Sequence, residues 1–507
     1  MSAGLMGVLS GGGETWAHIS GTTLSTYAGS TVVMLVLTGI LVLVFAIPAA
    51  WLVTMHEFPG RRFLEWLLIL PLAAPAYVLA IAYANLLGVA GPVQSGLRDM
   101  TGLSARDYWF PDINSLPGLS VILAAALYPY VYLAARAAFT TTSICTLDAA
   151  RTLGARPRDL LLRVALPAAR PAIIAGLSLA LMEAAADYGA ADYLGVQTLT
   201  VGVFRAWSSY GDVGAGARLA LILLALAVFL QWLERFDRGS AGSEATSKRW
   251  QSLTRARLNG WHGWAAAGFC FALFSLGFGI PVLRLLWIAI DTNAPVASLS
   301  GAAVNSILLA AAGASLAFIA GLAVALGARR KTGLSRLARL AASGGYAVPG
   351  AVLALGGLIV IGWLGLGLTG HVALLVLIWI YVCRFTVAGA EPMQAALARA
   401  PKSMDQAARS LAASPLRRLV RVDLPIAMSG AVVAALILFV EILKELPATL
   451  MLRPTGWDTL AVRAYGYASD ERVAEATVPC LLITLAGLVP VILLSVRLSR
   501  ARPGETA

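Results

Sequence analysis

Two pairs of acidic residues lie inside apolar stretches that are long enough to cross a membrane. Glu183 and Asp187 belong to the stretch 171–190, and Glu441 and Glu445 belong to the stretch 426–446. Each pair is spaced by four residues, so a helix would place both carboxylates on one face. A charged side chain near the centre of a bilayer is costly unless it faces protein or water. These acids therefore predict either a polar passage through the membrane or ion pairs buried between helices.

In the first interpretation, the acids line a passage for a cation. Glu183 and Glu441 would lie deeper in the membrane, and Asp187 and Glu445 would lie nearer the external mouth. Hard carboxylate and phenolate oxygens attract hard cations, and ferric iron is one of these. The candidate residues of the translocation path are Glu183, Asp187, Tyr188, Asp192, Glu441 and Glu445.

In the second interpretation, the deeper acids hold helices together. Glu183 and Glu441 would then form ion pairs with Arg136, Arg384 or Lys444. A charge that is buried with a partner avoids the large cost of a lone buried charge. Both interpretations fit the sequence.

A second pattern, found before each acidic pair, recurs along the chain. The segment 148–167 matches the segment 406–425 at a constant offset, since 406 − 148 and 425 − 167 are both 258. The acids share this offset, because 441 − 183 is also 258. The positions that define the pattern are Asp148, Ala149, Ala150, Gly154, Val164, Leu166 and Pro167, and then Gln406, Ala407, Ala408, Ala412, Val422, Leu424 and Pro425. The sequence therefore contains a duplication.

The residue types of the repeated segment allow close packing and a tight turn. Adjacent alanines, such as Ala149 and Ala150, allow two backbones to approach closely. Gly154 can adopt the conformation of a tight turn without a Cβ clash. Leu162 and Leu166 supply apolar contact surface, while the arginines of the segment remain in solvent.

The whole chain has the composition of a membrane protein. Of its 507 residues, 59% are hydrophobic and 13% are charged, whereas soluble domains carry about 25% charged residues. About 20 apolar residues are needed for a helix to cross the hydrocarbon core. Eleven stretches reach this length, at 31–54, 65–88, 118–139, 171–190, 215–233, 264–290, 303–327, 341–366, 370–390, 426–446 and 474–496. We therefore expect an all-α polytopic protein with about 11 transmembrane helices.

Basic residues collect in every second loop, and this sets the expected orientation. Loops rich in Lys and Arg are retained on the cytoplasmic side. Both repeated segments and the linker 236–262 belong to the basic set, whereas the loops 89–117 and 447–472 carry more acids. The net charge of +12 follows from this topology, so it does not indicate a nucleic-acid partner.

The repeated segments divide the chain into two halves that run in the same direction. An even number of spans separates them, so both segments face the cytoplasm. Pro75 and Pro349 begin a further match, at an offset of 274 (349 − 75). We expect a first repeat at 1–235, a flexible polar linker at 236–262 and a second repeat at 263–507. Many secondary transporters instead have inverted repeats.

The repeated segment resembles the EAA loop of ABC-importer permeases, a helix-turn-helix that fits a groove on the cytoplasmic ATPase subunit. The resemblance implies two parallel, tandem type I permease repeats, with one ATPase seated on each loop. The two copies have Asp148 and Gln406 where the family pattern has Glu, and Ala412 where it has Gly. The residues expected to dock the ATPases are Asp148, Ala149, Ala150, Gly154, Leu166, Pro167, Gln406, Ala407, Ala408, Ala412, Leu424 and Pro425.

Further motifs resemble the fused permeases of ferric-iron ABC importers. They are Phe58-Pro59-Gly60-Arg61-Arg62, Pro75-Ala76-Tyr77-Val78, Tyr128-Pro129-Tyr130-Val131-Tyr132 and Glu183-x-x-x-Asp187-Tyr188-Gly189. The second half departs furthest, with Glu445-Leu446-Pro447 in place of Asp187-Tyr188-Gly189. Related fused permeases of similar layout carry thiamine or other small solutes. The resemblance thus implies inward transport of ferric iron or of one of these solutes.

The resemblance also implies partners: two copies of a cytoplasmic ABC ATPase, an external or periplasmic solute-binding protein, and the lipid of a bacterial inner membrane. The chain has no G-x-x-x-x-G-K-[ST] phosphate loop, so we expect it to be a non-catalytic subunit whose partners hydrolyse ATP. Its four cysteines show no metal-binding spacing, and we expect no cofactor and no permanently held metal. The alternative from another class is an ion-coupled secondary carrier, in which the paired acids relay protons.

Overall fold

The computed structural model of the chain is almost entirely helical. It describes residues 13–141, 152, 154, 157–240, 255–293, 299–329, 333–367, 369–398, 404, 410, 414–428 and 430–500. Nine helices within these ranges are long and apolar enough to cross a membrane, or up to 11 if each of two bent helix pairs is one span. The prediction of an all-α polytopic membrane protein is confirmed.

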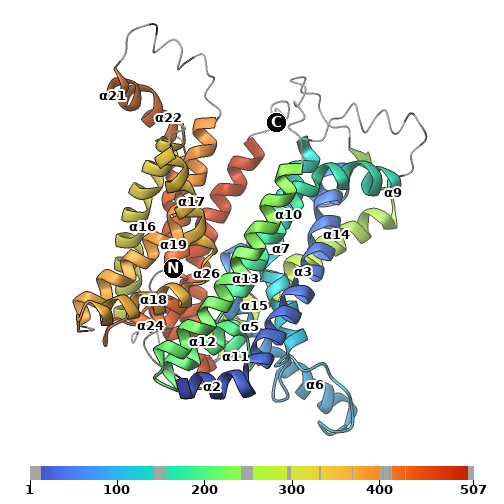
Figure 1. The fold of residues 1–507 in the computed structure, drawn as a ribbon. Helices are drawn as coiled ribbons and strands as arrows, with labels where there is room; N and C mark the ends of the chain where they lie inside the picture. Colours follow the sequence, from blue (N-terminus) through green and yellow to red (C-terminus); the bar gives the residue numbers. More distant parts are fainter. Residues whose placement is uncertain are drawn as a thin grey trace. The chain divides into compact units, whose positions relative to one another are not determined.

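The described residues form two compact units, which we name the N-unit and the C-unit (Figure 1). The N-unit is drawn from Trp16–Gly202 and Ala225–Ala294, and the C-unit from Val203–Leu224 and Pro295–Leu494. Helices α12 (Leu199–Ser208) and α13 (Val213–Ser240) run from one of these ranges into the other.

The N-unit holds most elements of the first half of the sequence and three helical segments that follow it. These elements are α2 (Gly13–Thr22), α3 (Leu24–Met55), β1 (His56–Glu57), α4 (Arg61–Leu67), η1 (Leu70–Ala73), α5 (Ala76–Leu87), α6 (Pro92–Thr101), α7 (Leu116–Thr141), α9 (Pro157–Asp159), η2 (Leu160–Ala165), α10 (Leu166–Ala186), α11 (Gly189–Tyr193), β2 (Ala256–Arg257), α14 (Trp261–Phe274), η3 (Ser275–Gly279) and α15 (Ile280–Asp291).

The C-unit holds the elements of the second half. These are α16 (Ser300–Arg329), α17 (Gly333–Ala347), α18 (Gly350–Trp363), α19 (Gly370–Ala398), α21 (Pro415–Arg418), η5 (Leu419–Asp423), α22 (Leu424–Met428), α23 (Ala431–Leu443), α24 (Pro447–Leu452), α25 (Leu460–Ser469) and α26 (Val473–Arg500).

The centre of the N-unit is formed by α3, α7 and α10, which pack side by side (Figure 1). Small residues allow this close packing, as they do between membrane helices in general. A Cβ atom on Gly176 would lie 2.9 Å from the Tyr130 carbonyl oxygen and 3.0 Å from the Val131 Cα. The glycine therefore sets the distance between α10 and α7.

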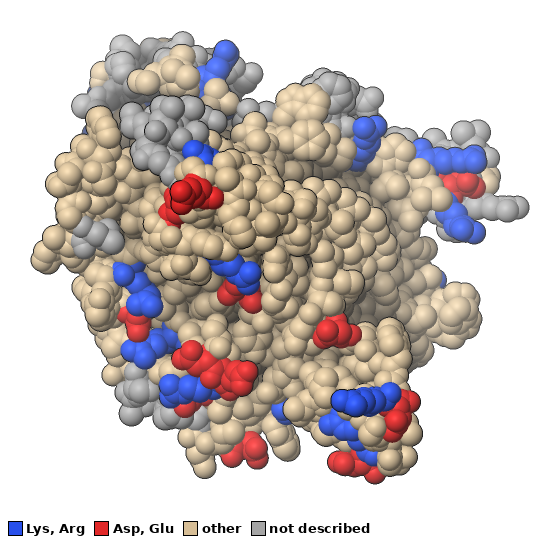
Figure 2. Space-filling view, turned by 60° about the horizontal axis from the view of Figure 1, so that its bottom comes forward, with Lys and Arg blue, Asp and Glu red and all other residues tan. Residues whose placement is uncertain are grey.

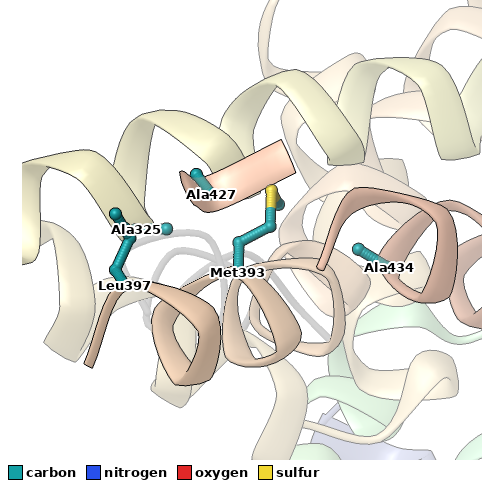
Figure 3. Close-up of a cluster of buried hydrophobic side chains, with 5 residues drawn as sticks. All are labelled: Ala325, Met393, Leu397, Ala427 and Ala434. Carbon is teal, nitrogen blue, oxygen red and sulfur yellow. The ribbon is translucent and has the colours of Figure 1, made fainter. Parts of the chain in front are cut away.

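The centre of the C-unit is formed by α16, α19 and α23, with α22 seated against them. Figure 3 shows the buried side chains that join these helices. A Cβ on Gly430 would collide with the Pro392 carbonyl, and a Cβ on Gly389 would lie 2.7 Å from the Leu438 Cδ1. The cluster consists of Ala325, Met393, Leu397, Ala427 and Ala434. The short helix α22 is thus packed directly onto two long spans.

The segment α14–η3–α15 packs against the N-unit, on α4, α5 and α7, although the sequence predicted it as the opening of the second repeat. A Cβ on Gly277 would lie 2.5 Å from the Ala125 carbonyl oxygen and 2.7 Å from the Pro71 Cγ. The Tyr83 hydroxyl donates to the Leu276 carbonyl at 2.6 Å. This segment is therefore built into the helices of the first half. The repeat boundaries themselves stay a prediction.

The two ends of the predicted flexible linker are ordered. Helix α13 continues to Ser240, and β2 pairs in parallel with β1 in the register His56 with Ala256 and Glu57 with Arg257. The Leu258 amide also donates to the Glu57 carbonyl at 3.0 Å. The middle of the linker, 241–254, lies outside the described residues. Flexibility is thus not a property of the whole linker, because backbone hydrogen bonds hold its last residues to the N-unit.

Three π-helical turns, η2, η3 and η5, share one cause. In each, the residue after the turn donates its N–H five residues back: Leu166 to Leu161, Ile280 to Ser275, and Leu424 to Leu419. The next residue is always a proline, at 167, 281 and 425. A proline has no N–H, and its ring collides with the carbonyl four residues back in an α-helix. The wider turn avoids that collision.

Each of the eleven predicted spans overlaps one of the nine long helices or one of the two bent pairs. The stretch 65–88 was placed too early, because its first residues form α4 and η1 and the long helix there is Ala76–Thr101. The stretch 341–366 was expected as one span, but it is divided between α17 and α18, which meet at an angle of 108°. The bend lies at Val348 and Pro349, and a residue before proline is disfavoured in the α conformation. On the face seen in Figure 2, charged side chains form small mixed groups with wide uncharged areas between them, as expected for a membrane protein.

Candidate functional site: membrane acids and docking segments

The span α10 carries Glu183 and ends directly before Asp187. The backbone of Asp187 is extended (φ −68°, ψ 125°), and its Oδ1 accepts hydrogen bonds from the amides of Ala190 at 2.9 Å and Ala191 at 3.2 Å. Asp187 therefore satisfies the free N–H groups at the start of the short helix α11. This gives the acid a structural task at the end of the span.

Glu445 has the same task in the C-unit, at the position 258 residues later. Its Oε1 accepts from the Ala448 amide at 3.0 Å, and its Oε2 accepts from the Thr449 amide at 3.0 Å and hydroxyl at 2.6 Å. These amides begin the short helix α24. Both halves thus use the second acid of the pair to cap the helix that follows the span.

Glu445 also has a basic partner. The Arg384 Nη1 donates to the Glu445 Oε1 at 3.3 Å, and both side chains are buried. The Tyr381 hydroxyl and the Thr449 hydroxyl lie 2.7 Å apart and extend the network. At the offset of 258, Arg384 corresponds to Ala126, so Asp187 has no equivalent arginine in the N-unit.

The two deeper acids also differ. Glu441 forms an ion pair with Lys444, with 2.7 Å between Oε1 and Nζ. Glu183 is half-buried, and in the part of the chain that the structure describes its carboxylate forms no ion pair or hydrogen bond. The anticipated pair Glu441–Lys444 is present, whereas Arg136 pairs with Glu65. Among the described residues, Glu441 and Glu445 therefore each have a basic partner, whereas Glu183 and Asp187 have none.

Tyr188, which directly precedes α11, lies next to Asp192 of that helix. The Tyr188 hydroxyl donates to the Asp192 Oδ2 at 3.2 Å. The Thr200 hydroxyl donates to the Ala185 carbonyl at 2.6 Å, and the Leu199 amide donates to the Thr31 hydroxyl at 2.9 Å. The last two bonds fix the start of α12 to the end of α10 and to α3. A path role for any of the six predicted residues stays a prediction.

Sequence reasoning missed a buried charge cluster at the basic turn after α3. The Arg61 Nε lies 2.9 Å from the Glu57 Oε2, and its Nη1 lies 3.0 Å from the Glu65 Oε2. Glu65 also pairs with Arg136 of α7, and Arg255 of the linker lies 3.9 Å from Glu57. The available signal was Glu65 itself, a charge next to an apolar stretch. The cluster joins β1, α4, α7 and the end of the linker.

Much of each predicted docking segment lies outside the described residues, namely Asp148, Ala149, Ala150, Gln406, Ala407, Ala408 and Ala412. Gly154 is described and has φ +82°, which confirms the turn expected there. Leu166 and Leu424 each begin a helix, and Pro167 and Pro425 follow them. The role of these residues in docking remains a prediction.

The described parts of the two docking segments have the same local structure. Each contains a short helix that begins at a proline, Pro157 or Pro415, then a π turn and then a longer helical stretch. In both, one apolar side chain of the π turn is exposed: Leu162 at 57% and Val420 at 52%. These positions are equivalent, since 420 − 162 is 258. Each segment therefore presents an apolar residue that a partner protein could cover.

The sequence matches a known family model twice, at residues 21–237 and 313–502. The model describes the binding-protein-dependent transport system inner membrane component. The chain belongs to this family. It is therefore a multi-pass permease of the bacterial inner membrane, and the double match agrees with a fused, duplicated permease. The segment α14–η3–α15 lies between the two matched ranges.

Curated relatives of this permease include proteins for different solutes. The Fe(3+)-transport system permease protein FbpB 2 of Haemophilus influenzae is 24% identical over 459 residues, covering 88% of this chain and 84% of that protein. The probable ABC transporter permease protein y4fN of Sinorhizobium fredii is 26% identical, covering 89% and 83%. The molybdenum transport system permease protein ModB of Escherichia coli is 30% identical, covering 39% of this chain and 88% of that protein.

Proposed function

We propose that this chain is the transmembrane subunit of an ABC importer that carries a metal cation, with ferric iron as the first candidate. A solute-binding protein would deliver the cation on the external side, and two copies of a cytoplasmic ATPase would drive alternating access through the segments 148–167 and 406–425. The chain itself would hydrolyse nothing. The similarity to FbpB 2 over most of both chains supports this solute class.

The observation that carries the proposal is the unbalanced charge of the N-unit acids. Glu183 lies half-buried in a membrane span without a basic partner among the described residues, one turn before Asp187. A carboxylate in this setting is stabilised by a passing cation, because a lone charge in the membrane is costly. It repels an oxyanion. In the C-unit, Lys444 and Arg384 already neutralise the corresponding acids.

A permease for an oxyanion is the second candidate, because the molybdenum permease ModB is 30% identical to part of the chain. An oxyanion permease would require that the membrane acids only cap helices and form ion pairs, and do not contact the solute. An ion-coupled carrier remains the alternative from another class. The matched docking segments, each with an exposed apolar residue, favour the ATP-driven importer over the carrier.

The test compares the two deeper acids in the reconstituted complex of permease, ATPase and binding protein. We expect Glu183→Gln to lower ATP-driven uptake of ferric iron about tenfold, which corresponds to the loss of one charge-assisted contact of roughly 1.4 kcal/mol. Glu441→Gln, whose acid is already paired, is the matched control and should change uptake less than threefold.

Three results would contradict the proposal. Equal losses in both variants would leave only a structural role for the acids. Uptake of molybdate in place of iron, with Glu183→Gln neutral, would favour the oxyanion permease. Solute accumulation by the permease alone, driven by a proton gradient, would establish the carrier.

A further inference from the structure

Helix α17 follows the end of the span α16 that the basic loops predict to be cytoplasmic. The basic residue Arg329 ends α16, and α17 begins at Gly333. α17 packs on α16 and α19 through a buried side that includes Ser335, Ala342 and Ala347. In Figure 1 it lies in the half of the C-unit nearer to α22, which contains the last two residues of the predicted docking segment 406–425. The bend of 108° turns it away from the axis of α18.

The side of α17 that faces away from the protein is apolar. Leu334, Leu337 and Leu340 are spaced by three residues and are 78%, 64% and 45% exposed. Residues at this spacing form one stripe along a helix. The span α16 also carries exposed apolar side chains, among them Leu316 and Ile319. The apolar stripe of α17 is therefore suited to contact with lipid, as an exposed apolar helix side beside basic residues is.

Two exposed arginines, Arg336 and Arg339, border the leucine stripe. Within the described residues neither forms an ion pair with an acid. The equivalent position to Arg336 in the N-unit is Arg62, since 336 − 62 is 274. Arg62 belongs to α4, which packs against α14. The neighbouring Arg61 forms ion pairs with Glu57 and Glu65. On α17 the basic charge faces outward beside an apolar surface.

We propose that α17 is a binding surface for anionic phospholipid of the cytoplasmic leaflet. The leucines lie among the acyl chains, and the guanidinium groups of Arg336 and Arg339 bind the lipid phosphate. A planar guanidinium donates paired hydrogen bonds to phosphate oxygens. A helix with one apolar side and basic residues beside it is suited to the interface plane. This surface is independent of the solute that the permease carries.

The experiment measures lipid binding to the full chain, purified with its ATPase in neutral detergent, by native mass spectrometry. Phosphatidylglycerol and phosphatidylcholine are added in equal amounts. We expect the unaltered chain to bind phosphatidylglycerol preferentially. Arg336→Gln with Arg339→Gln should weaken phosphatidylglycerol binding about thirtyfold, because each surface arginine contributes roughly a factor of five. Arg336→Lys with Arg339→Lys should retain most of the binding.

The control removes two arginines elsewhere, Arg106→Gln with Arg257→Gln, and should bind lipid as the unaltered chain does. Leu337→Ser should weaken the binding of both lipids.

Unchanged preference for phosphatidylglycerol in the double glutamine variant would overturn the proposal. Loss of lipid on adding excess ATPase would assign the surface to that protein, and equal competition by inorganic phosphate would assign it to a free anion. Circular dichroism and size-exclusion profiles confirm that each variant is folded.

Discussion

At the scale of single residues, the acids of the two halves share positions but differ in charge balance. Asp187 and Glu445 both cap the short helix that follows a span. Their positions in the sequence are therefore explained by the backbone amides that they bind. Glu445 is also paired with Arg384, while Asp187 has no such arginine. Both halves therefore have the same capping geometry. We expect them to differ in how much stability is lost when the capping acid is replaced.

We expect Glu445→Gln to lower the free energy of unfolding by about 3 kcal/mol, because it leaves the buried Arg384 without its counter-charge. Asp187→Asn should cost less than about 1 kcal/mol, since asparagine is also a good cap. Thermal unfolding in detergent, followed by circular dichroism, compares the two. Replacing both members of the pair, with Arg384→Met and Glu445→Leu, should recover part of the loss. Equal shifts for Glu445→Gln and Asp187→Asn would show that the ion pair contributes little.

At the scale of elements, the proline-linked π turns explain why the docking segments look alike. A proline at the second position of the following helix forces the turn to widen. The widened turn lies in the same place in both segments, and it exposes Leu162 in one and Val420 in the other. The same local sequence feature therefore exposes one apolar residue at the equivalent position of each segment.

We expect Val420→Asp to abolish the co-purification of the ATPase, because a carboxylate would have to be buried in the interface without a partner. The matched control is Val89→Asp, which changes an exposed valine of a predicted external loop and should leave ATPase binding intact. Leu162→Asp should act as Val420→Asp does. Normal ATPase recovery with both docking variants would show that this surface is not the docking site.

The sequence predicted these elements well where the signal is local. Apolar length located every long helix and both bent pairs, although the predicted stretch 65–88 begins about ten residues before the long helix Ala76–Thr101. The division of 341–366 was missed because a long apolar run shows no break, although Val348 and Pro349 mark it. The pair Glu65–Arg136 was missed because its members are 71 residues apart in sequence. Pairings over such distances follow from packing, which a single sequence does not display.

At the scale of the whole molecule, the two matched permease ranges are connected by a segment that belongs to neither of them. The segment α14–η3–α15 follows the linker, yet it is built into the N-unit by Gly277, by Tyr83 and by the pairing of β2 with β1. Pro281 leaves the Leu276 carbonyl without its helical donor, and the Tyr83 hydroxyl takes that place. The C-terminal half thus carries its own attachment to the N-terminal half.

This arrangement predicts that the covalent linker is dispensable for assembly. We expect fragments 1–247 and 248–507, expressed together, to co-purify, because α14–η3–α15 of the second fragment still packs on α4, α5 and α7 of the first. Gly277→Leu should lower the recovery of the second fragment at least fivefold, because even a Cβ at this position would meet the Ala125 carbonyl. Gly268→Leu is the matched control, because Gly268 lies on the same segment but has open space around its Cβ position. This variant should leave the recovery of the second fragment unchanged. Equal recovery with both variants would mean that other contacts join the halves, since α14–η3–α15 would then be replaceable.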